Sequence, residues 1–207
     1  MHRRAVIVDY GMGNLRSVFN KLKVVGQHAE VSSSPEVIRR ADFLILPGVG
    51  HFAKGISNIK ELGLWDLLNE MVLVKATPIM GICLGMQLMA NSSEEGDSEG
   101  FGWIEGRIHQ NIHSDYLRFK VPHIGWNDVD RGIDNLFFEG VDGTKKFYFV
   151  HGYHMQCSNK NDVLATSEYD FEFVSAVQRK NIVGFQFHPE KSHLQGQKLF
   201  QNVLQIL

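Results

Sequence analysis

The first half of the chain alternates short apolar runs with segments of helical periodicity. Residues 5–9, 43–46 and 78–82 have the length and composition of buried strands. Between the first two runs, residues 14–25 place apolar side chains at spacings of three and four, which is one face of a helix. Strands that alternate with helices pack as a parallel sheet with helices on both faces. The sequence therefore predicts an open α/β fold.

The second half differs, because strand-like segments follow one another with short connections. These segments are residues 102–108, 146–155, 163–167, 173–178 and 182–188. Short connections join antiparallel strands, whereas parallel neighbours need a longer crossover. We therefore expect a mostly parallel sheet that ends in an antiparallel or mixed portion, followed by a last helix that carries Phe200, Val203 and Leu207 on one face.

Length and composition limit the classes of protein that fit. A chain of 207 residues with 43% apolar content predicts one folded domain over residues 1–207. A net charge of −2 argues against a nucleic-acid surface. Asp9 interrupts the apolar run that a secretory signal would need, and no stretch is long enough to span a membrane. Cys83 and Cys157 alone cannot form a disulfide framework, so we expect a reduced, cytoplasmic protein.

A cysteine flanked by glycines stands where a strand is expected to meet a helix. Gly81 and Gly85 allow the sharp turn on which Cys83 would stand clear of the sheet. The carboxyl ends of the strands carry the active site in open α/β sheets, and the N–H groups that begin a helix stabilise a thiolate. The pattern favours Cys83 as a nucleophile; a small buried side chain is the alternative.

A histidine and a glutamate follow the last predicted strand. His188 and Glu190 are two residues apart, and residues two apart on an extended chain point to the same side. Glu190 could then orient His188 as the general base of a triad with Cys83. The alternative is a solvated histidine and glutamate at the end of a strand.

The glycine-containing loop over residues 47–50 follows another buried strand. Its glycines leave backbone N–H groups free to face a ligand, and we expect Val49, Gly50 and the N–H of Leu84 to form an oxyanion hole. An ordinary tight turn is the alternative.

Metal and nucleotide sites are not expected. His151 and His154, like His109 and His113, lack a second cluster of metal-ligand spacing. The segment Gly11-Met12-Gly13 is too short for a dinucleotide fingerprint. We therefore predict no metal and no cofactor.

Six motifs together resemble the class I, or triad, glutamine amidotransferases. More narrowly they resemble the glutaminase subunit of imidazole glycerol phosphate synthase, and the resemblance runs nearly end to end. The order and spacing of the motifs make the resemblance specific. They are residues 9–15, 46–50, 81–88, 122–127, 148–151 and 186–192.

The resemblance implies a flavodoxin-like sheet and hydrolysis of glutamine to glutamate and ammonia through a thioester on Cys83. It also implies a pocket for the glutamine head group, lined by Gln87, Glu95, His151, Gly152 and Tyr153. In the family, ammonia passes to a (β/α)₈ synthase subunit that makes imidazole glycerol phosphate in histidine biosynthesis. We expect that partner to dock beside the triad, on Asn14, His123, Trp126, Asn127 and Lys191.

Other readings stay open from the sequence. His51 and Gly152 depart from the family pattern, and residues 100–104 and 191–193 resemble a paralogous branch that supplies ammonia for sugar amidation in bacterial surface polysaccharides. Another Cys-His hydrolase, such as a peptidase, would not need Gln87 or Glu95. A catalytically dead scaffold subunit would not need Cys83, His188 and Glu190.

Overall fold

Short apolar segments form adjacent parallel strands at the centre of the molecule. The computed structural model describes residues 3–131, 135–141 and 146–207. Every residue of the central strands is buried, which requires the continuous apolar runs seen in the sequence. These strands are β1 (Ala5–Val8), β3 (Phe43–Gly48), β4 (Ile79–Cys83) and β14 (Ile182–Phe185). With β2 (Ala29–Ser32) at the edge, the parallel order is β2-β1-β3-β4-β14.

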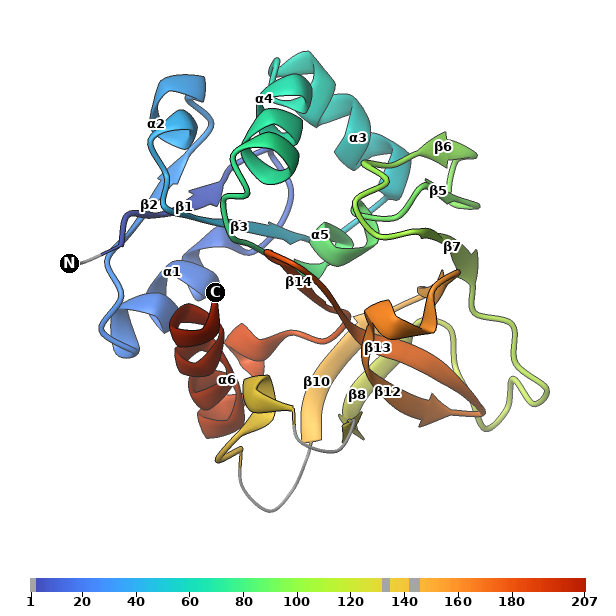
Figure 1. Cartoon of the computed structure of the whole chain (residues 1–207). Helices are drawn as coiled ribbons and strands as arrows, with labels where there is room; N and C mark the ends of the chain where they lie inside the picture. Colours follow the sequence, from blue (N-terminus) through green and yellow to red (C-terminus); the bar gives the residue numbers. More distant parts are fainter. Residues whose placement is uncertain (1–2, 132–134, 142–145) are drawn as a thin grey trace.

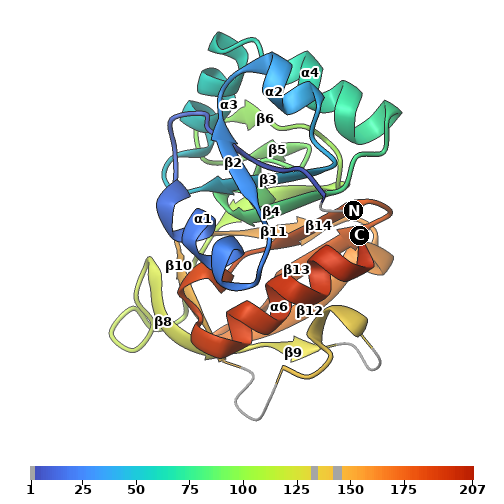
Figure 2. The same cartoon turned by 90° about the vertical axis from the view of Figure 1, so that its left-hand side faces the viewer.

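Helices cover both faces of these strands (Figures 1 and 2). On one face lie α2 (Pro35–Arg39), α3 (Phe52–Glu61) and α4 (Trp65–Asn69), which continues as a π-helical turn over Glu70–Val74. On the other face lie α1 (Leu15–Val24) and α6 (His193–Ile206). The predicted α/β arrangement is confirmed.

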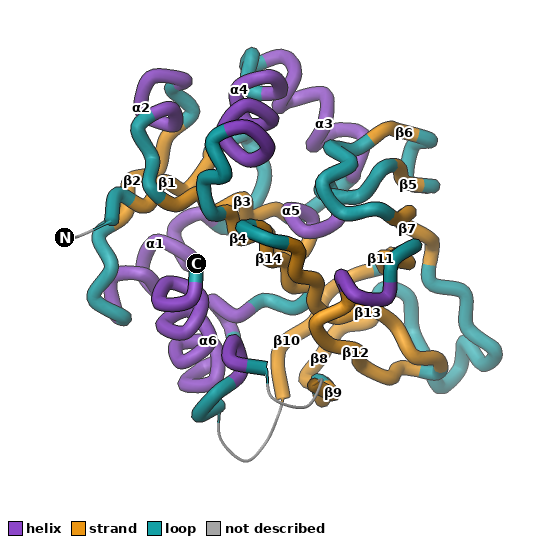
Figure 3. The backbone as a smooth tube through the Cα atoms, viewed as in Figure 1, coloured by secondary structure: helices purple, strands orange, loops and turns teal. Residues whose placement is uncertain are grey.

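The remaining strands extend the sheet in mostly antiparallel order beyond β14 (Figure 3). The path runs β14-β13-β11-β7 and on to the short β5 and β6, while β12 and β9 lie along the other edge of β13. The strands are β5 (Ser92–Ser93), β6 (Ser98–Glu99), β7 (Gly106–Gln110), β9 (Asp130–Arg131), β11 (Tyr153–Cys157), β12 (Val163–Tyr169) and β13 (Phe171–Arg179). The predicted antiparallel portion is thus present.

A separate two-stranded sheet pairs β8 (His123–Asp128) with β10 (Lys146–His151). The prediction of one strand over residues 146–155 is wrong, because the chain leaves this small sheet at Gly152 and enters the main sheet as β11. The helix α3 and the strand β8 were not predicted. Strands also differ at their ends, since β7 begins at Gly106 and β14 ends at Phe185.

Short helical turns complete the fold and position the site. The helix α5 (Leu84–Gln87) begins directly after β4, and 3₁₀ turns form over Leu136–Phe138, Lys160–Asp162 and Pro189–Lys191. Among the described residues, no helix has both the length and the apolar character needed to cross a membrane.

Candidate active site

Cys83 occupies a strained turn between β4 and α5. Its φ is +53° and its ψ is −109°, a conformation that non-glycine residues rarely adopt. The turn depends on close backbone packing, because a Cβ at Gly85 would overlap the carbonyl oxygen of Leu46 and a Cβ at Gly81 would crowd the Gly85 backbone. The geometry is that of a nucleophile held at the carboxyl edge of a sheet.

The sulfur of Cys83 lies between a hydrogen-bond acceptor and a donor. Its Sγ lies 3.7 Å from the carbonyl oxygen of Val150 and 3.7 Å from Nε2 of Gln186. The residue is only 6% exposed. The thiol can therefore donate to Val150, and Gln186 can donate to the sulfur.

His188 and Glu190 form a buried pair beside it. Nδ1 of His188 lies 2.8 Å from Oε1 of Glu190, and both side chains are 2% exposed. The sequence predicted this juxtaposition from an extended chain, but the backbone instead forms a 3₁₀ turn at Pro189–Lys191. The N–H of His188 donates to Tyr148 O, and Ser192 Oγ donates to His188 O, so the turn is held on both sides.

The electrostatics of His188 suit an imidazolium that forms next to sulfur. Burial lowers the pKa of His188, but the negative charge on Cys83 and the hydrogen bond from Nδ1 to Glu190 outweigh burial and raise that pKa above its ordinary value. The other ring nitrogen, Nε2, is buried and has no hydrogen-bond partner within hydrogen-bond geometry among the described residues. With Nδ1–H donated to Glu190, Nε2 is free to accept a proton.

A pocket of about 430 Å³ opens over Cys83. It brings together every residue that the sequence assigned to the oxyanion hole and to glutamine binding. The lining residues are Val49, Gly50, His51, Cys83, Leu84, Gln87, Glu95, Pro122, Val150, His151, Gly152 and Tyr153. Leu84 is the first residue of α5, so its N–H has no intrahelical partner.

The pocket residues are fixed by backbone contacts. Oε2 of Glu95 accepts a hydrogen bond of 2.7 Å from the N–H of Phe52 at the start of α3. Gln87 is buried, and its Nε2 donates to Tyr153 O and to Gln186 Oε1. Among the described residues, a Cβ at Gly152 would come within 4 Å of Val121 Cγ1 alone, at 3.5 Å, so a side chain could be accommodated there.

The paired strands β8 and β10 bring two buried histidines, His123 and His151, together. His151 Nδ1 lies 2.8 Å from Tyr153 O, and His151 Nε2 lies 3.2 Å from His123 Nδ1. Burial lowers the pKa of His151 to about 3 and that of His123 to about 4, so both rings are neutral near pH 7. Since Tyr153 O can only accept, His151 carries its proton on Nδ1 and His123 donates to it.

The residues expected at a docking face differ in how exposed they are. His123 differs most from the expectation, because it is 3% exposed and stacks on Tyr169. Asn127 turns its side chain toward β12, where Nδ2 donates to Glu168 O. Trp126 is 45% exposed, and it contacts Tyr148, over whose ring Lys191 Nζ lies at 5.5 Å. Asn14 is exposed and caps α1.

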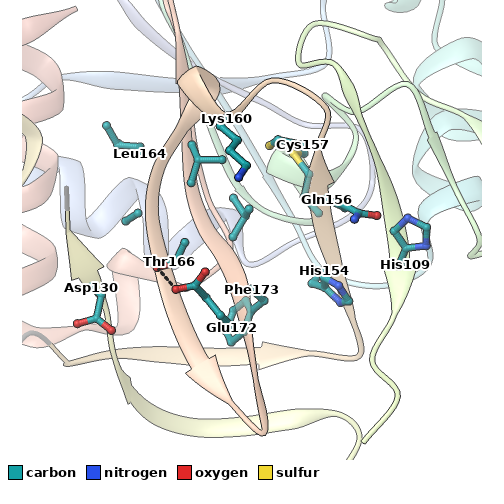
Figure 4. Close-up of a pocket in the computed structure, with 14 residues that line it drawn as sticks. His109, Asp130, His154, Gln156, Cys157, Lys160, Leu164, Thr166, Glu172 and Phe173 are labelled. Atoms are coloured by element: carbon teal, nitrogen blue, oxygen red, sulfur yellow. Dashed lines mark hydrogen bonds between the residues drawn. The ribbon is translucent and has the colours of Figure 1, made fainter.

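A larger pocket of about 730 Å³ lies on the antiparallel part of the sheet (Figure 4). It runs from Asp130 and Thr166 past Glu172 to Cys157 and His109, and it shares no lining residue with the Cys83 pocket. Within the residues that the structure describes, no group of three or more His, Cys, Asp or Glu side chains is arranged to hold a metal ion.

Comparison with known proteins identifies the family. The model of "Glutamine amidotransferase class-I" matches residues 6–206. The chain belongs to the class I glutamine amidotransferase family. A solved structure titled "Crystal structure of glutamine amidotransferase" shares the amidotransferase fold with a TM-score of 0.75 at 20% identity, and 97% of each chain is covered.

Two curated proteins from Methanococcus maripaludis are more similar in sequence. One, named imidazole glycerol phosphate synthase subunit HisH 2, is 48% identical over 96% of this chain and 97% of its own length. The other, named imidazole glycerol phosphate synthase subunit HisH 1, is 41% identical over 97% of this chain and 98% of its own length. The resemblance inferred from the motifs is thereby confirmed.

Sequence reasoning missed several residues that surround the amidotransferase cysteine. Val150 and Pro122 line its pocket, and Gln186 contacts the sulfur, yet none was assigned a role. A signal was present for Gln186, which lies within the motif of residues 186–192 and two positions before His188. Val150 acts through its backbone carbonyl, which no residue type can indicate.

Proposed function

We propose that this chain is the glutaminase subunit of imidazole glycerol phosphate synthase in histidine biosynthesis, folded as one domain over residues 1–207. The observation that carries the proposal is that Cys83 lines a pocket that Glu95 also lines, while the buried His188–Glu190 pair interacts with the charge on Cys83. The relatives named imidazole glycerol phosphate synthase subunit support the same assignment. Two free cysteines suit the reduced cytoplasm.

The hydrolysis begins with a proton transfer. Nε2 of His188 takes the proton of the Cys83 thiol, and the thiolate attacks the side-chain amide carbon of glutamine. The oxygen of the tetrahedral intermediate accepts hydrogen bonds from the N–H of Leu84 and from the loop at Val49 and Gly50. His188 then gives its proton to the departing nitrogen, so ammonia leaves and a γ-glutamyl thioester remains on Cys83.

A water molecule completes the reaction. His188 Nε2 removes a proton from water, and the resulting hydroxide attacks the thioester carbon. The carbon–sulfur bond then breaks, glutamate leaves, and His188 returns its proton to the sulfur of Cys83. Glu190 keeps the imidazole in the required tautomer and stabilises the imidazolium in both steps. The pocket holds the other end of glutamine, with the Glu95 carboxylate toward the α-ammonium group and His151, Gly152 and Tyr153 along the wall beside Gln87.

A (β/α)₈ synthase subunit receives the ammonia in a heterodimer. Ammonia is mostly protonated at neutral pH and then no longer nucleophilic, so it must pass to the partner without meeting water. We place the partner on the surface formed by Trp126, Tyr148 and Lys191, because Lys191 ends the 3₁₀ turn that carries Glu190 and Trp is enriched at interface hot spots. We include Asn14 in the same proposed surface, because it caps α1 and α1 packs against that turn. We leave out of this docking surface His123, which is buried, and Asn127, whose side chain donates to Glu168 O on β12.

One observation favours an alternative acceptor for the ammonia. Methanococcus maripaludis has two such subunits, and this chain is 48% identical to the one numbered 2 but 41% identical to the one numbered 1. A duplicated subunit can serve a different synthase. The alternative is therefore a glutaminase that supplies ammonia for sugar amidation in surface polysaccharide synthesis.

The decisive experiment combines the chain with a purified histidine-pathway synthase subunit. Glutamine hydrolysis should rise when the synthase subunit and its acceptor are added, and aminated product should form in step with glutamate. Hydrolysis without any product from that acceptor would move the chain to the sugar-amidating alternative. Absence of hydrolysis with every partner would contradict the glutaminase assignment.

A further inference from the structure

Gln186 is a buried amide on the bend that follows β14. Its side chain has no exposed surface, and its backbone N–H donates to Ser175 O at 2.9 Å. The side chain reaches two groups, because Oε1 lies 3.0 Å from Gln87 Nε2 and Nε2 lies 3.7 Å from Cys83 Sγ. Gln186 is therefore fixed at two points, by the hydrogen bond of its backbone N–H and by the hydrogen bond that its Oε1 accepts.

The backbone determines which way both amides point. Tyr153 O can only accept, so the atom of Gln87 that lies 3.1 Å from it must be the Nε2 donor. The second hydrogen of that Nε2 points at Gln186, which must then offer its oxygen. The remaining end of Gln186 is the NH₂ group, and it faces the sulfur. One peptide carbonyl thus fixes two side-chain amides in series.

The sulfur consequently meets different partners in its two protonation states. As a thiol, Cys83 can donate its S–H to Val150 O at 3.7 Å. As a thiolate it has no hydrogen to donate, and the N–H of Gln186 becomes the better partner because it donates to negative charge. His188, directly before the 3₁₀ turn, and Tyr10, in the loop after β1, also interact with the charge on Cys83.

We propose that Gln186 is a further catalytic residue, whose Nε2–H group donates to Cys83 Sγ and holds it as a thiolate, and that Gln87 is a positioning residue that acts through Gln186. This inference rests on the proposed role of Cys83 as the nucleophile. When the thiol ionises, its proton passes to His188 Nε2 and both electrons of the S–H bond stay on sulfur. Gln186 keeps its own protons throughout.

The test is the pH dependence of Cys83 alkylation by iodoacetamide, followed by mass spectrometry of the Cys83 peptide. Only the thiolate reacts, so the midpoint of the rate profile reports how well the site stabilises it. Loss of one hydrogen bond to a charged group in Gln186→Met should raise that midpoint by about one pH unit or more, which slows alkylation roughly tenfold at a fixed pH below it. Cys157 can be followed on its own peptide.

The structure supplies the control variants. Gln178→Met changes a half-buried glutamine of β13 whose side chain donates to Lys180 O, and it should leave the Cys83 profile unchanged. Gln87→Met should shift the profile in the same direction as Gln186→Met. The double variant should shift it no further than Gln186→Met alone, because the two residues act in series.

Each outcome decides a part of the proposal. A Cys83 profile that stays at the parent midpoint in Gln186→Met overturns the role of Gln186, and a shift in Gln186→Met but not in Gln87→Met removes Gln87 from the positioning role. If Gln186→Met does not fold, as judged by circular dichroism, Gln87→Met carries the same test. The alkylation assay needs neither glutamine nor a partner, so a parent that fails to hydrolyse glutamine overturns the proposed function separately.

Discussion

Replacing Glu190 by glutamine should slow glutamine hydrolysis strongly while leaving substrate binding intact. Nδ1 of His188 and Oε1 of Glu190 lie 2.8 Å apart, and both side chains are 2% exposed, so water does not screen the pair. A charge-assisted hydrogen bond of this kind contributes about 1.5–3 kcal/mol, which is roughly 10- to 100-fold in rate if it is lost from the imidazolium state.

The tautomer adds to that loss. An amide NH₂ at position 190 can donate to Nδ1, and the proton of the neutral ring then moves to Nε2. His188 in that form cannot accept the proton of Cys83. Both effects act on the chemical step, so we expect Glu190→Gln to lower kcat by about 10³-fold or more, as such changes do in other triads.

Steady-state glutamate formation, measured in the complex with the synthase subunit, checks this prediction. KM for glutamine should stay near the parent value, because Glu190 does not line the pocket. A Glu190→Asp variant keeps the charge but shortens the reach, and it should fall between parent and Glu190→Gln. A rise in KM with unchanged kcat would refute the reasoning and make Glu190 a substrate-binding residue.

Four further predictions follow from the same structure. Cys83→Ala should lower hydrolysis by at least ~10³-fold, whereas acceptor amination from external ammonium should survive, and residual hydrolysis close to the parent rate would exclude Cys83 as nucleophile. Gly85→Ala should destabilise the fold by several kcal/mol, because its Cβ overlaps Leu46 O, and urea unfolding with a parent-like midpoint would contradict that packing. The free energy of unfolding should fall as the pH drops from about 6.5 toward 4, because His123 and His151 stay neutral in the folded state but bind protons in the unfolded state. Each histidine should contribute a slope of about 1.4 kcal/mol per pH unit. His123→Phe should reduce this slope in urea titrations, and an unchanged slope would contradict the prediction. Lys191→Glu should weaken association with the synthase subunit and lower the ratio of aminated product to glutamate, and titration showing parent affinity with a ratio near unity would remove Lys191 from the docking surface.

The sequence predicts the central strands because burial on both faces demands continuous apolar runs. It predicts Cys83 at an elbow because Gly81 and Gly85 permit backbone contacts that a Cβ would block. Residues 146–155 were predicted as a single strand, whereas they belong to two strands, β10 and β11. The prediction failed because nothing in the sequence at Gly152 indicates that the chain changes sheets there. Local periodicity cannot show which strands pair, and that pairing is decided by tertiary contacts.

The candidate site, like the fold, could be predicted only in part from the sequence. His188 and Glu190 could be paired from their spacing, although the 3₁₀ turn that joins them could not be predicted, because Pro189 fits several backbone conformations. His123 was expected at the surface from its motif, but its stacking on Tyr169 depends on a strand 46 positions away in sequence numbering, from 123 to 169. The orientation of the Gln186 donor depends on the Gln87 side chain and on the Tyr153 carbonyl, so only the folded chain reveals it.

The central claim is that Cys83 is the nucleophile of a glutaminase, and an alkylating glutamine analogue tests it most directly. Cys157 provides the internal comparison, because burial and the nearby Asp162 raise its pKa to about 12. The account predicts that the analogue labels Cys83 and not Cys157, that excess glutamine protects Cys83, and that hydrolysis is lost in proportion to labelling. Labelling of Cys157 instead, or labelling of Cys83 that glutamine does not prevent, would contradict the account.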